Sequence, residues 1–229
     1  MHPAVTCRPD VQAAVSALSA HLVHPRQEHV NAAIRVIHYL WTTRSLELKY
    51  SSEMSGTTSF FGTCDASFNA THDCKGITGW AYHLNGGAIS FKARRQDLVA
   101  LSSTESELIA VDECVRELRY LHKLLQDFNV QVSLPTIIGQ DNMSTIALLK
   151  GSHFNARTRH VALRFHHAGE QQEAGVVRFE YLPTDIMPAD VLTKGLARGP
   201  HRQHTLVLLG YMQLRWETTR GPQHKPEGV

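Results

Sequence analysis

Four acidic residues of this chain stand at positions where a carboxylate is unusual. Asp65 interrupts an alternating apolar strand, Asp141 follows a short apolar strand, and Asp190 begins the last expected helix. Glu107 lies on the apolar stripe of a long helix. No histidine or cysteine occupies an equivalent position, and an all-oxygen ligand set is the one that Mg²⁺ or Mn²⁺ prefers.

The charges of these acids indicate a reaction class. Convergent carboxylates repel one another unless cations lie between them, so such a cluster implies metal. Two metal ions about 4 Å apart can activate a water molecule and stabilise the leaving oxygen of a phosphodiester. Considered singly, Asp141 could cap the helix that follows it, and Asp190 could interact with the dipole of the helix that it begins. As a set, the four acids predict metal-dependent phosphodiester hydrolysis.

The stretch LSSTESELIAV, residues 101–111, contains two glutamates with different surroundings. Ser102 and Glu105 have the S-x-x-E spacing of a capping box, with Ser102 as the N-cap and Glu105 reaching back to it. With about 100° of rotation per residue, Glu107 shares a face with the apolar residues of the helix, and Glu105 lies about 160° away. A buried acid is costly unless it is paired or holds a metal. We therefore assign Glu107, and not Glu105, to the predicted site.

Composition excludes several classes of protein. The chain has 229 residues, 42% of them hydrophobic, and a net charge of +2, which permits a nucleic-acid partner without requiring one. Its four cysteines form no C-x-x-C pair and its 15 histidines no H-E-x-x-H motif, so neither a disulfide scaffold nor a zinc site is expected. No apolar run reaches the length of a membrane span, and no signal-like segment follows Met1. We expect reduced thiols, no membrane partner and a protein that is not secreted.

The order of the expected elements predicts an α/β fold with a mixed sheet. Alternating apolar segments and an Asn85-Gly86 turn indicate an antiparallel meander within residues 59–95, preceded by a short strand at residues 46–52. The later elements are expected at residues 103–128 (helix), 136–140 (strand), 143–150 and 156–175 (helices), 176–182 (strand) and 188–197 (helix). In such sheets ligands bind at the strand ends where the order reverses.

Residues 1–57 are expected to form a separate helical segment. Their two amphipathic helices, at residues 11–22 and 27–43, carry no acid on the apolar stripes. Since these stripes exceed what two short helices can bury in each other, we expect them to drive association. A chain that starts near Ser55 is expected to stay folded and monomeric. The three predicted parts are the helical segment, an α/β domain and a flexible tail, at residues 1–57, 58–212 and 213–229.

Several stretches of the chain are arranged as in a known family. In order they are RPDVQAAVSALS, EHVNAAIRVIHYL, CDASFN, KGITGWAYHLNGGAISFKARRQ, VALSSTESELIAV, QDNMSTIALLK, RTRHVALRF, FEYLPT and ADVLTK. In this order, and above all in VALSSTESE, the chain resembles the RNase H region of copia-type LTR retrotransposon polyproteins. The resemblance runs from about residue 8 to about residue 210 and includes the helical segment that follows their reverse transcriptase.

The resemblance implies an RNase H-like fold, a mixed five-stranded sheet flanked by helices and preceded by a small helical segment. It implies cleavage of the RNA strand of RNA–DNA hybrids with two Mg²⁺ ions, which Mn²⁺ can replace. It places the catalytic, metal-binding acids on Asp65, Glu107, Asp141 and Asp190. Residues 1–57 resemble the end of a reverse transcriptase, so the polymerase domain of the same polyprotein is an expected partner. The implied location is the cytoplasm, in a virus-like particle, or the nucleus.

Substrate contacts are expected beside the acids. Basic and polar residues at the end of the hairpin could bind phosphates, and polar residues near Glu107 and Asp141 could reach 2′-hydroxyl groups, which distinguish RNA from DNA. A solvated strand end is the alternative interpretation of the first set, and Arg157 and Arg159 form a further candidate patch. The first set is Lys92, Arg94, Arg95 and Gln96, and the second is Ser103, Thr104 and Asn142.

Some positions depart from the family's pattern. An aspartate and a tryptophan usual after the first acid are Ser67 and Phe68, and Ala162 and His167 replace an acid and an aromatic residue. None of the four catalytic candidates is affected, which favours an active nuclease over a silent remnant that binds hybrid or reverse transcriptase. An integrase- or resolvase-like nuclease is disfavoured, because such chains typically carry three acids. No Y-x-D-D motif occurs, so no polymerase activity is expected.

The two glutamates give the first test. Glu107→Gln is expected to abolish cleavage of a labelled RNA–DNA hybrid with little change in folding, because it removes a ligand charge and keeps the side-chain shape. Glu105→Gln is expected to cost only about 1 kcal/mol of unfolding free energy, through the helix cap, and to leave cleavage intact. An equal loss of activity in both variants would contradict the assignment.

Overall fold

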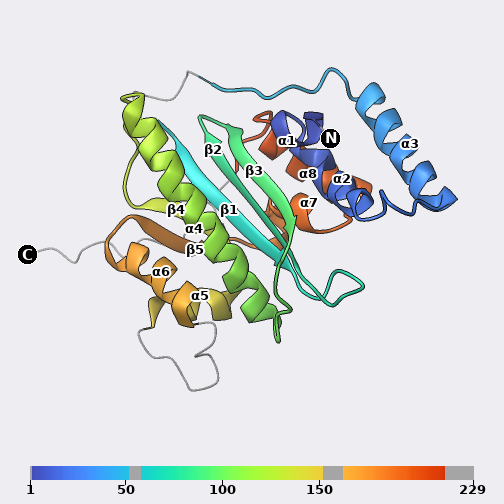
Figure 1. The fold of residues 1–229 in the computed structure, drawn as a ribbon. Coiled ribbons are helices and arrows are strands. Elements are labelled where there is room, and N and C mark those ends of the chain that lie inside the picture. Colours follow the sequence, from blue (N-terminus) through green and yellow to red (C-terminus); the bar gives the residue numbers. More distant parts are fainter. Residues whose placement is uncertain (1, 52–57, 152–161, 215–229) are drawn as a thin grey trace, which may run out of the picture.

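The core of the chain is a mixed five-stranded sheet (Figure 1). The computed structural model describes residues 2–51, 58–151 and 162–214. β1 pairs antiparallel with β2, which pairs antiparallel with β3, while β4 and β5 extend the sheet parallel to β1. The predicted fold class is thus confirmed. In the order β3-β2-β1-β4-β5, the strands are β3 (Gly87–Arg95), β2 (Ile77–Leu84), β1 (Phe60–Ser67), β4 (Thr136–Gln140) and β5 (Val177–Tyr181).

The turn between β2 and β3 is formed by Asn85 and Gly86, as predicted. Their φ values are 49° and 101°, and Leu84 pairs with Gly87 directly across the turn. Two consecutive positive φ values are typical of a type I′ turn, whose twist matches that of the strands it joins. Glycine adopts the second of these values without strain. The hairpin therefore sets the register of two of the three antiparallel strands.

Three helices cover one face of the sheet: α4 (Ser103–Asp127), α5 (Met143–Lys150) and α6 (Ala162–Glu173) (Figure 1). The apolar stripe of α4 packs against β1 and β2, with Val111, Val115 and Leu118 fully buried. The hydroxyl of Tyr82, on β2, donates to the Cys114 carbonyl oxygen at 2.8 Å. Because α4 is held along its length, the position of its first turn is fixed relative to the strand ends.

Two helices near the end of the chain pack on the opposite face: α7 (Asp190–Thr193) and α8 (Arg198–Leu208). Together with Ala81 of β2, residues of both helices form a second apolar cluster. The helix predicted at residues 188–197 is wrong in extent, because α7 is one turn long, and α8 was not predicted. Gly199 and Pro200 suggest a helix break, yet both lie in the first turn of α8, where backbone N–H groups have no intrahelical acceptor.

A buried ion pair lies within the N-terminal part, and the backbone of one of its members contacts α8. Arg8 Nη2 lies 2.8 Å from Asp10 Oδ2, and the Tyr39 hydroxyl donates to the same oxygen at 2.7 Å. The His201 ring, on α8, lies 3.1 Å from the Asp10 carbonyl oxygen. A domain boundary near residue 57 remains a prediction, since the contact of Asp10 with His201 crosses it. The elements of this part are α1 (His2–Thr6), the 3₁₀ turn η1 (Pro9–Val11), α2 (Gln12–Ser19) and α3 (Gln27–Thr42).

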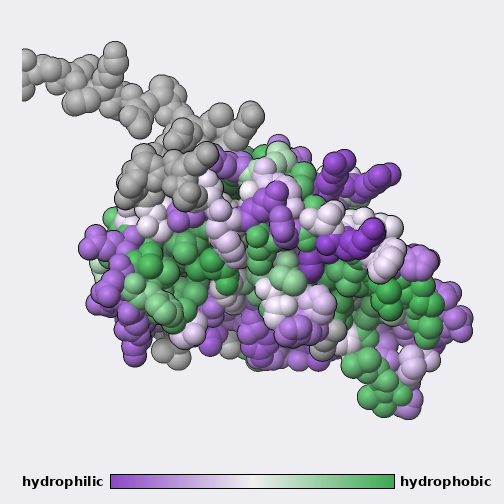
Figure 2. All heavy atoms as spheres, turned by 90° about the horizontal axis from the view of Figure 1, so that it is seen from above, coloured by the Kyte–Doolittle hydropathy of each residue, from purple (hydrophilic) through white to green (hydrophobic). Residues whose placement is uncertain are grey.

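The helix α3 presents apolar side chains to solvent. None of its residues is buried. Hydrophobic atoms cover much of this helix at the right of Figure 2. Association through this surface stays a prediction. The largest side chains of the stripe, between 42% and 68% exposed, are Val30, Ile34, Ile37 and Trp41.

The strand predicted at residues 46–52 is absent from the described residues 46–51. The backbone there bonds to two different elements: Lys49 N–H donates to Leu209 O at 2.8 Å and Ser51 N–H to Asn85 O at 2.9 Å. Because these acceptors do not belong to one strand, no ladder forms. The candidate patch of Arg157 and Arg159, and residues 215–229 of the predicted tail, lie outside the described residues.

Two expectations from composition concern thiols and membranes. All four cysteines are free, with Cys64 and Cys114 buried and Cys7 and Cys74 exposed. Within residues 2–51, 58–151 and 162–214, no helix combines the length and the apolar character that crossing a bilayer requires.

Replacing Arg8 by Ala is expected to lower the unfolding free energy by about 3–5 kcal/mol, because Asp10 would stay buried without its cation. Arg35→Ala removes the same charge from an exposed position of α3 and should change stability by no more than about 0.5 kcal/mol. Urea denaturation of both variants measures the difference. Equal stability of the two would show that the ion pair does not anchor the N-terminal part.

Candidate functional site

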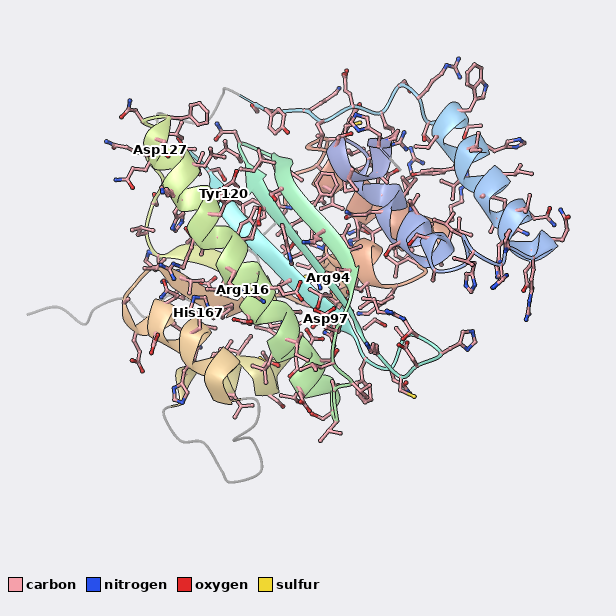
Figure 3. The ribbon with its side chains drawn as sticks, in the orientation of Figure 1. Arg94, Asp97, Arg116, Tyr120, Asp127 and His167 are labelled. Atoms are coloured by element: carbon pink, nitrogen blue, oxygen red, sulfur yellow. The ribbon has the colours of Figure 1, made fainter. Side chains whose placement is uncertain are left out.

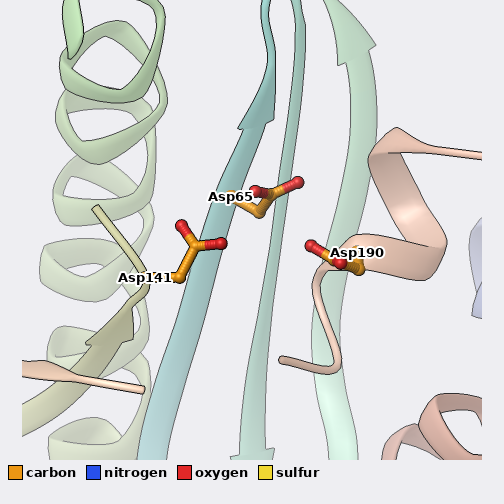
Figure 4. Close-up of side chains that lie close together, drawn as sticks. All are labelled: Asp65, Asp141 and Asp190. Carbon is orange, nitrogen blue, oxygen red and sulfur yellow. The ribbon is translucent and has the colours of Figure 1, made fainter. Parts of the chain in front are cut away.

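Three aspartates converge at one end of the sheet (Figure 4). Asp65 lies on β1, Asp141 directly follows β4, and Asp190 is the first residue of α7. Each offers a carboxylate oxygen, and these oxygen atoms all lie within 4.8 Å of one another. β1 has an antiparallel neighbour on one side and the parallel strand β4 on the other. The aspartates therefore gather where the strand order reverses, as predicted.

Burial makes this acidic group resist ionisation. Asp65 is 0% exposed, and Asp190 is also buried. Loss of solvation is the largest cause that raises the pKa of Asp65, Asp141 and Asp190. The charge of Asp65 raises the pKa of Asp141 further, and the charge of Asp190 does the same to Asp65. Carboxylates that repel one another out of water gain most from a cation placed between them.

Glu107 lies beside this group, on the buried stripe of α4, as predicted. It is 6% exposed, and Gln140 Nε2 donates to its Oε2 atom at 3.1 Å. Burial, followed by the charges of Asp65 and Asp141, raises the pKa of Glu107 to about 9. The structure thus brings three of the predicted acids within 4.8 Å and couples the fourth to two of them electrostatically.

Glu105 has a different environment, at the helix cap. The Ser102 hydroxyl accepts a hydrogen bond from Glu105 N–H at 3.1 Å, so Ser102 is the N-cap, as predicted. The Glu105 carboxylate accepts from Leu101 N–H at 2.8 Å, one residue before the N-cap. The capping box was therefore predicted correctly on one side only. Glu105 therefore stabilises the N-terminus of α4, and Glu107 lies in the helical turn that follows.

Thr193 and Lys194 belong to the site, although the sequence analysis does not single them out. The Lys194 ammonium lies 3.1 Å from Asp65 Oδ1 and 2.9 Å from Asp190 Oδ1. The Thr193 hydroxyl donates to Asp65 Oδ2. Burial alone would lower the pKa of Lys194, but the two aspartates outweigh it and raise this pKa. The i, i+4 spacing of Asp190 and Lys194 was the available signal.

The close approach of α7 to the sheet depends on Gly79 of β2. Gly79 pairs with Asp65 across the two strands. A Cβ atom at this position would lie 2.5 Å from Thr193 Cγ2 and 2.9 Å from Leu192 Cβ. Because real Cβ atoms do not approach this closely, any side chain at position 79 must displace α7. Gly79 thus allows the residues of α7 to reach Asp65.

The predicted phosphate contacts at the end of β3 differ in their availability. Arg94 Nη2 lies 2.6 Å from Asp97 Oδ2 (Figure 3), and Arg95 Nη1 lies 3.1 Å from Asp73 Oδ2. Gln96 is a correction, because it is 1% exposed and its Nε2 atom donates to Ser106 O at 2.9 Å. Its side chain fastens the hairpin to α4, where it cannot reach a substrate.

The predicted 2′-hydroxyl contacts lie beside two of the acids. Ser103 and Thr104 are in the first turn of α4, the first exposed and the second half-buried. Asn142, the residue after Asp141, is the N-cap of α5, and its side chain accepts from Thr145 N–H at 3.0 Å. The backbone N–H of Asn142 donates to Gln140 Oε1 at 3.0 Å. Gln140 therefore links the loop of Asp141 to Glu107.

Known proteins with similar sequences were found over most of the chain. No family profile matches. The retrovirus-related Pol polyprotein from transposon TNT 1-94 of Nicotiana tabacum is 31% identical over 207 residues, which are 86% of this chain and 15% of that polyprotein. The corresponding polyprotein from transposon RE2 of Arabidopsis thaliana is 33% identical over 194 residues, 83% of this chain and 13% of its own length. The chain thus spans only a small part of these relatives.

A solved structure with a similar arrangement is that of LC11-RNase H1 in complex with an RNA/DNA hybrid. It aligns with a TM-score of 0.44 and 13% sequence identity, over 59% of this chain and 94% of that one.

Gly79→Ala is expected to lower the unfolding free energy by about 1–3 kcal/mol, because the added methyl group overpacks the contact with α7. Gly169→Ala is the matched control: a Cβ atom at this position of α6 would meet nothing within 4 Å. Alanine is the better helix former, so this control should gain about 0.5–1 kcal/mol. Urea denaturation measures both changes, and a Gly79→Ala variant as stable as its parent would refute the close packing of α7.

Glu107 is expected to make the metal-free protein less stable as the pH rises. Its pKa is raised from 4.5 to about 9, so between these values the folded state keeps a proton that the unfolded state has released, and the unfolding free energy falls. Glu107→Gln cannot ionise and should lack this part of the fall, so its advantage over the parent grows toward the upper value. Denaturation in EDTA across this range is the measurement, and parallel curves would exclude the raised pKa.

Proposed function

Because the chain is homologous to part of the Pol polyproteins of copia-type retrotransposons, we propose that it is a metal-dependent ribonuclease H that hydrolyses the RNA strand of RNA–DNA hybrids. The observation that carries this proposal is the convergence of Asp65, Asp141 and Asp190 within 4.8 Å, with Glu107 buried beside them. Buried, mutually repelling carboxylates cost stability, and a bound divalent cation accounts for their arrangement.

The residues present fit a divalent metal. The converging donors are carboxylate oxygens, the ligands that Mg²⁺ takes in proteins. A cation already lies against two of them, because the Lys194 ammonium contacts both Asp65 and Asp190. The proposed cofactor is a pair of Mg²⁺ ions, for which Mn²⁺ can substitute. Their proposed ligands are Asp65, Glu107, Asp141 and Asp190.

The ions would supply an activated water molecule and would neutralise charge on the leaving oxygen. The chain's own residues hold the ligands in place, since each of three carboxylates accepts a hydrogen bond from a neighbouring side chain. Such bonds fix the orientation of metal ligands. The donors and their carboxylates are Thr193 with Asp65, Thr184 with Asp141, and Gln140 with Glu107.

The carboxyl group of Glu107 would release a proton when the site binds a metal. With a pKa of about 9, its carboxyl group is protonated at neutral pH while no metal is bound. A carboxyl ligand must lose its proton to bind a metal, so loading of the site releases a proton to solvent. Metal affinity should therefore rise with pH.

The proposed substrate surface lies around the acids. Lys92 is exposed on β3, and its ammonium group is the first proposed phosphate contact. Arg94 and Arg95 would have to exchange Asp97 and Asp73 for phosphate. The proposed contacts to 2′-hydroxyl groups, beside Glu107 and Asp141, are Ser103, Thr104 and Asn142.

Within a longer polyprotein, the proposed partner is the reverse transcriptase polymerase domain. Residues 1–57 would be the helical segment next to it, and residues 58–212 the nuclease domain. No polymerase activity is proposed, because the chain has no Y-x-D-D motif. The proposed location is the cytoplasm, within a virus-like particle, or the nucleus.

Cleavage of a labelled RNA–DNA hybrid tests the proposed function. The full chain is expected to cut the RNA strand with Mg²⁺ or Mn²⁺, to be inactive in EDTA, and to leave double-stranded DNA intact. Binding of the hybrid without cleavage in either metal would support the alternative, a silent remnant that keeps the fold for binding.

Metal linkage gives a test that does not need a substrate. Mg²⁺ is expected to raise the melting temperature of the parent more than that of Asp141→Asn, which lacks one ligand. In EDTA the variant should be at least as stable as the parent, since one repelling charge is gone. Asp127→Asn, at the exposed end of α4 (Figure 3), should respond to Mg²⁺ like the parent. A melting temperature of the parent that ignores Mg²⁺ would argue against the metal site.

A further inference from the structure

Lys194 contacts the acids where a metal ion would bind. Its Nζ atom is within 3.1 Å of one oxygen of Asp65 and 2.9 Å of one oxygen of Asp190. Both carboxylates belong to the group whose oxygen atoms lie within 4.8 Å of one another. A divalent ion bound by these two aspartates would therefore lie next to an ammonium group of the same sign. The two cations cannot share the position without strong repulsion.

Lys194 is also the cation that neutralises the site in the metal-free protein. Among the described residues, no other Lys, Arg or His forms an ion pair with any of the four acids. Its positive charge opposes the effect of burial on the pKa of both Asp65 and Asp190. Without Lys194, these buried carboxylates would have hydrogen bonds but no counterion from the residues that the structure describes.

The side chain of Lys194 is placed so that it can leave. It follows the last residue of α7, with an extended backbone (φ −131°, ψ 150°), and its side chain is 33% exposed. Rotation about the side-chain bonds can move the ammonium into water while α7 stays in place. The helix itself is held by packing at Gly79 and by the Thr193 hydroxyl on Asp65.

We propose that Lys194 is a built-in counterion that occupies the position between Asp65 and Asp190 until a divalent cation displaces it. This inference rests on the proposed metal site and adds the residue that sets its affinity. Metal binding breaks two ion pairs of Lys194, so the residue weakens metal affinity and stabilises the metal-free fold. The site then stays neutralised at low metal concentration and binds metal only at a higher concentration than it would without Lys194.

Lys194→Met tests the exchange, because it keeps most of the side-chain length and removes the charge. Lys123→Met makes the same change of charge on the exposed surface of α4. Calorimetric titration of the full chain with Mn²⁺ is expected to give about tenfold tighter binding for Lys194→Met than for the parent, a coupling of ordinary size between two sites. Lys123→Met should match the parent. In EDTA, Lys194→Met should melt at a lower temperature than either.

The titration distinguishes failure of the Lys194 exchange from failure of the proposed metal site. If the parent binds Mn²⁺ and Lys194→Met binds it equally or more weakly, the exchange is refuted and the metal site stands. If neither protein binds Mn²⁺, both the exchange and the proposed metal site are refuted. If only Lys194→Met binds, Lys194 excludes the metal and is not displaced by it, so the exchange is refuted. Should Lys194→Met be unfolded in EDTA, its circular dichroism during Mn²⁺ addition is the readout, and failure to refold would overturn the proposal.

Discussion

Negative charge held out of water at the end of β1 is the constraint on which the rest of this structure depends. Asp65 has no exposed surface. The carboxylates of Glu107 on α4, of Asp141 directly after β4 and of Asp190 on α7 join it there. Such a group opposes folding, so its position must be maintained by packing elsewhere. Two apolar clusters, one on each face of the sheet, supply that packing. The first includes residues of β1 and β2, and the second joins β2 and β3 to α7 and α8.

His167, one of the residues that the sequence analysis singled out as a departure from the expected pattern, takes part in a contact between two helices. Its ring atom Nδ1 lies 3.3 Å from Asp112 Oδ1, and Arg116 Nη2 lies 3.0 Å from Asp112 Oδ2 (Figure 3). The replacement gives a polar contact between α6 and α4. Asp112 is buried in this contact, whereas the four acids come from β1, the end of β4, α4 and α7.

Local patterns in the sequence predicted what depends on near neighbours. The Asn85-Gly86 turn, the short strand β4 and the separation of Glu107 from Glu105 each follow from a few adjacent residues. Features that depend on distant contacts were not predictable in this way. Gly79 looks like an ordinary strand glycine until α7 is packed on it, and Gln96 looks like a surface residue until α4 covers it.

The order of the elements along the chain links the proposed site to the completion of synthesis. Asp65 and Thr193, which share a hydrogen bond, are 128 positions apart, and all five strands have been made by Tyr181. Chains are made from the N-terminus, so a growing chain has the material for its whole sheet before Asp190 exists. The cluster of three aspartates then lacks a member, and the cation of Lys194 is also missing. The topology thus delays completion of the proposed site until residues 190–194 have been made.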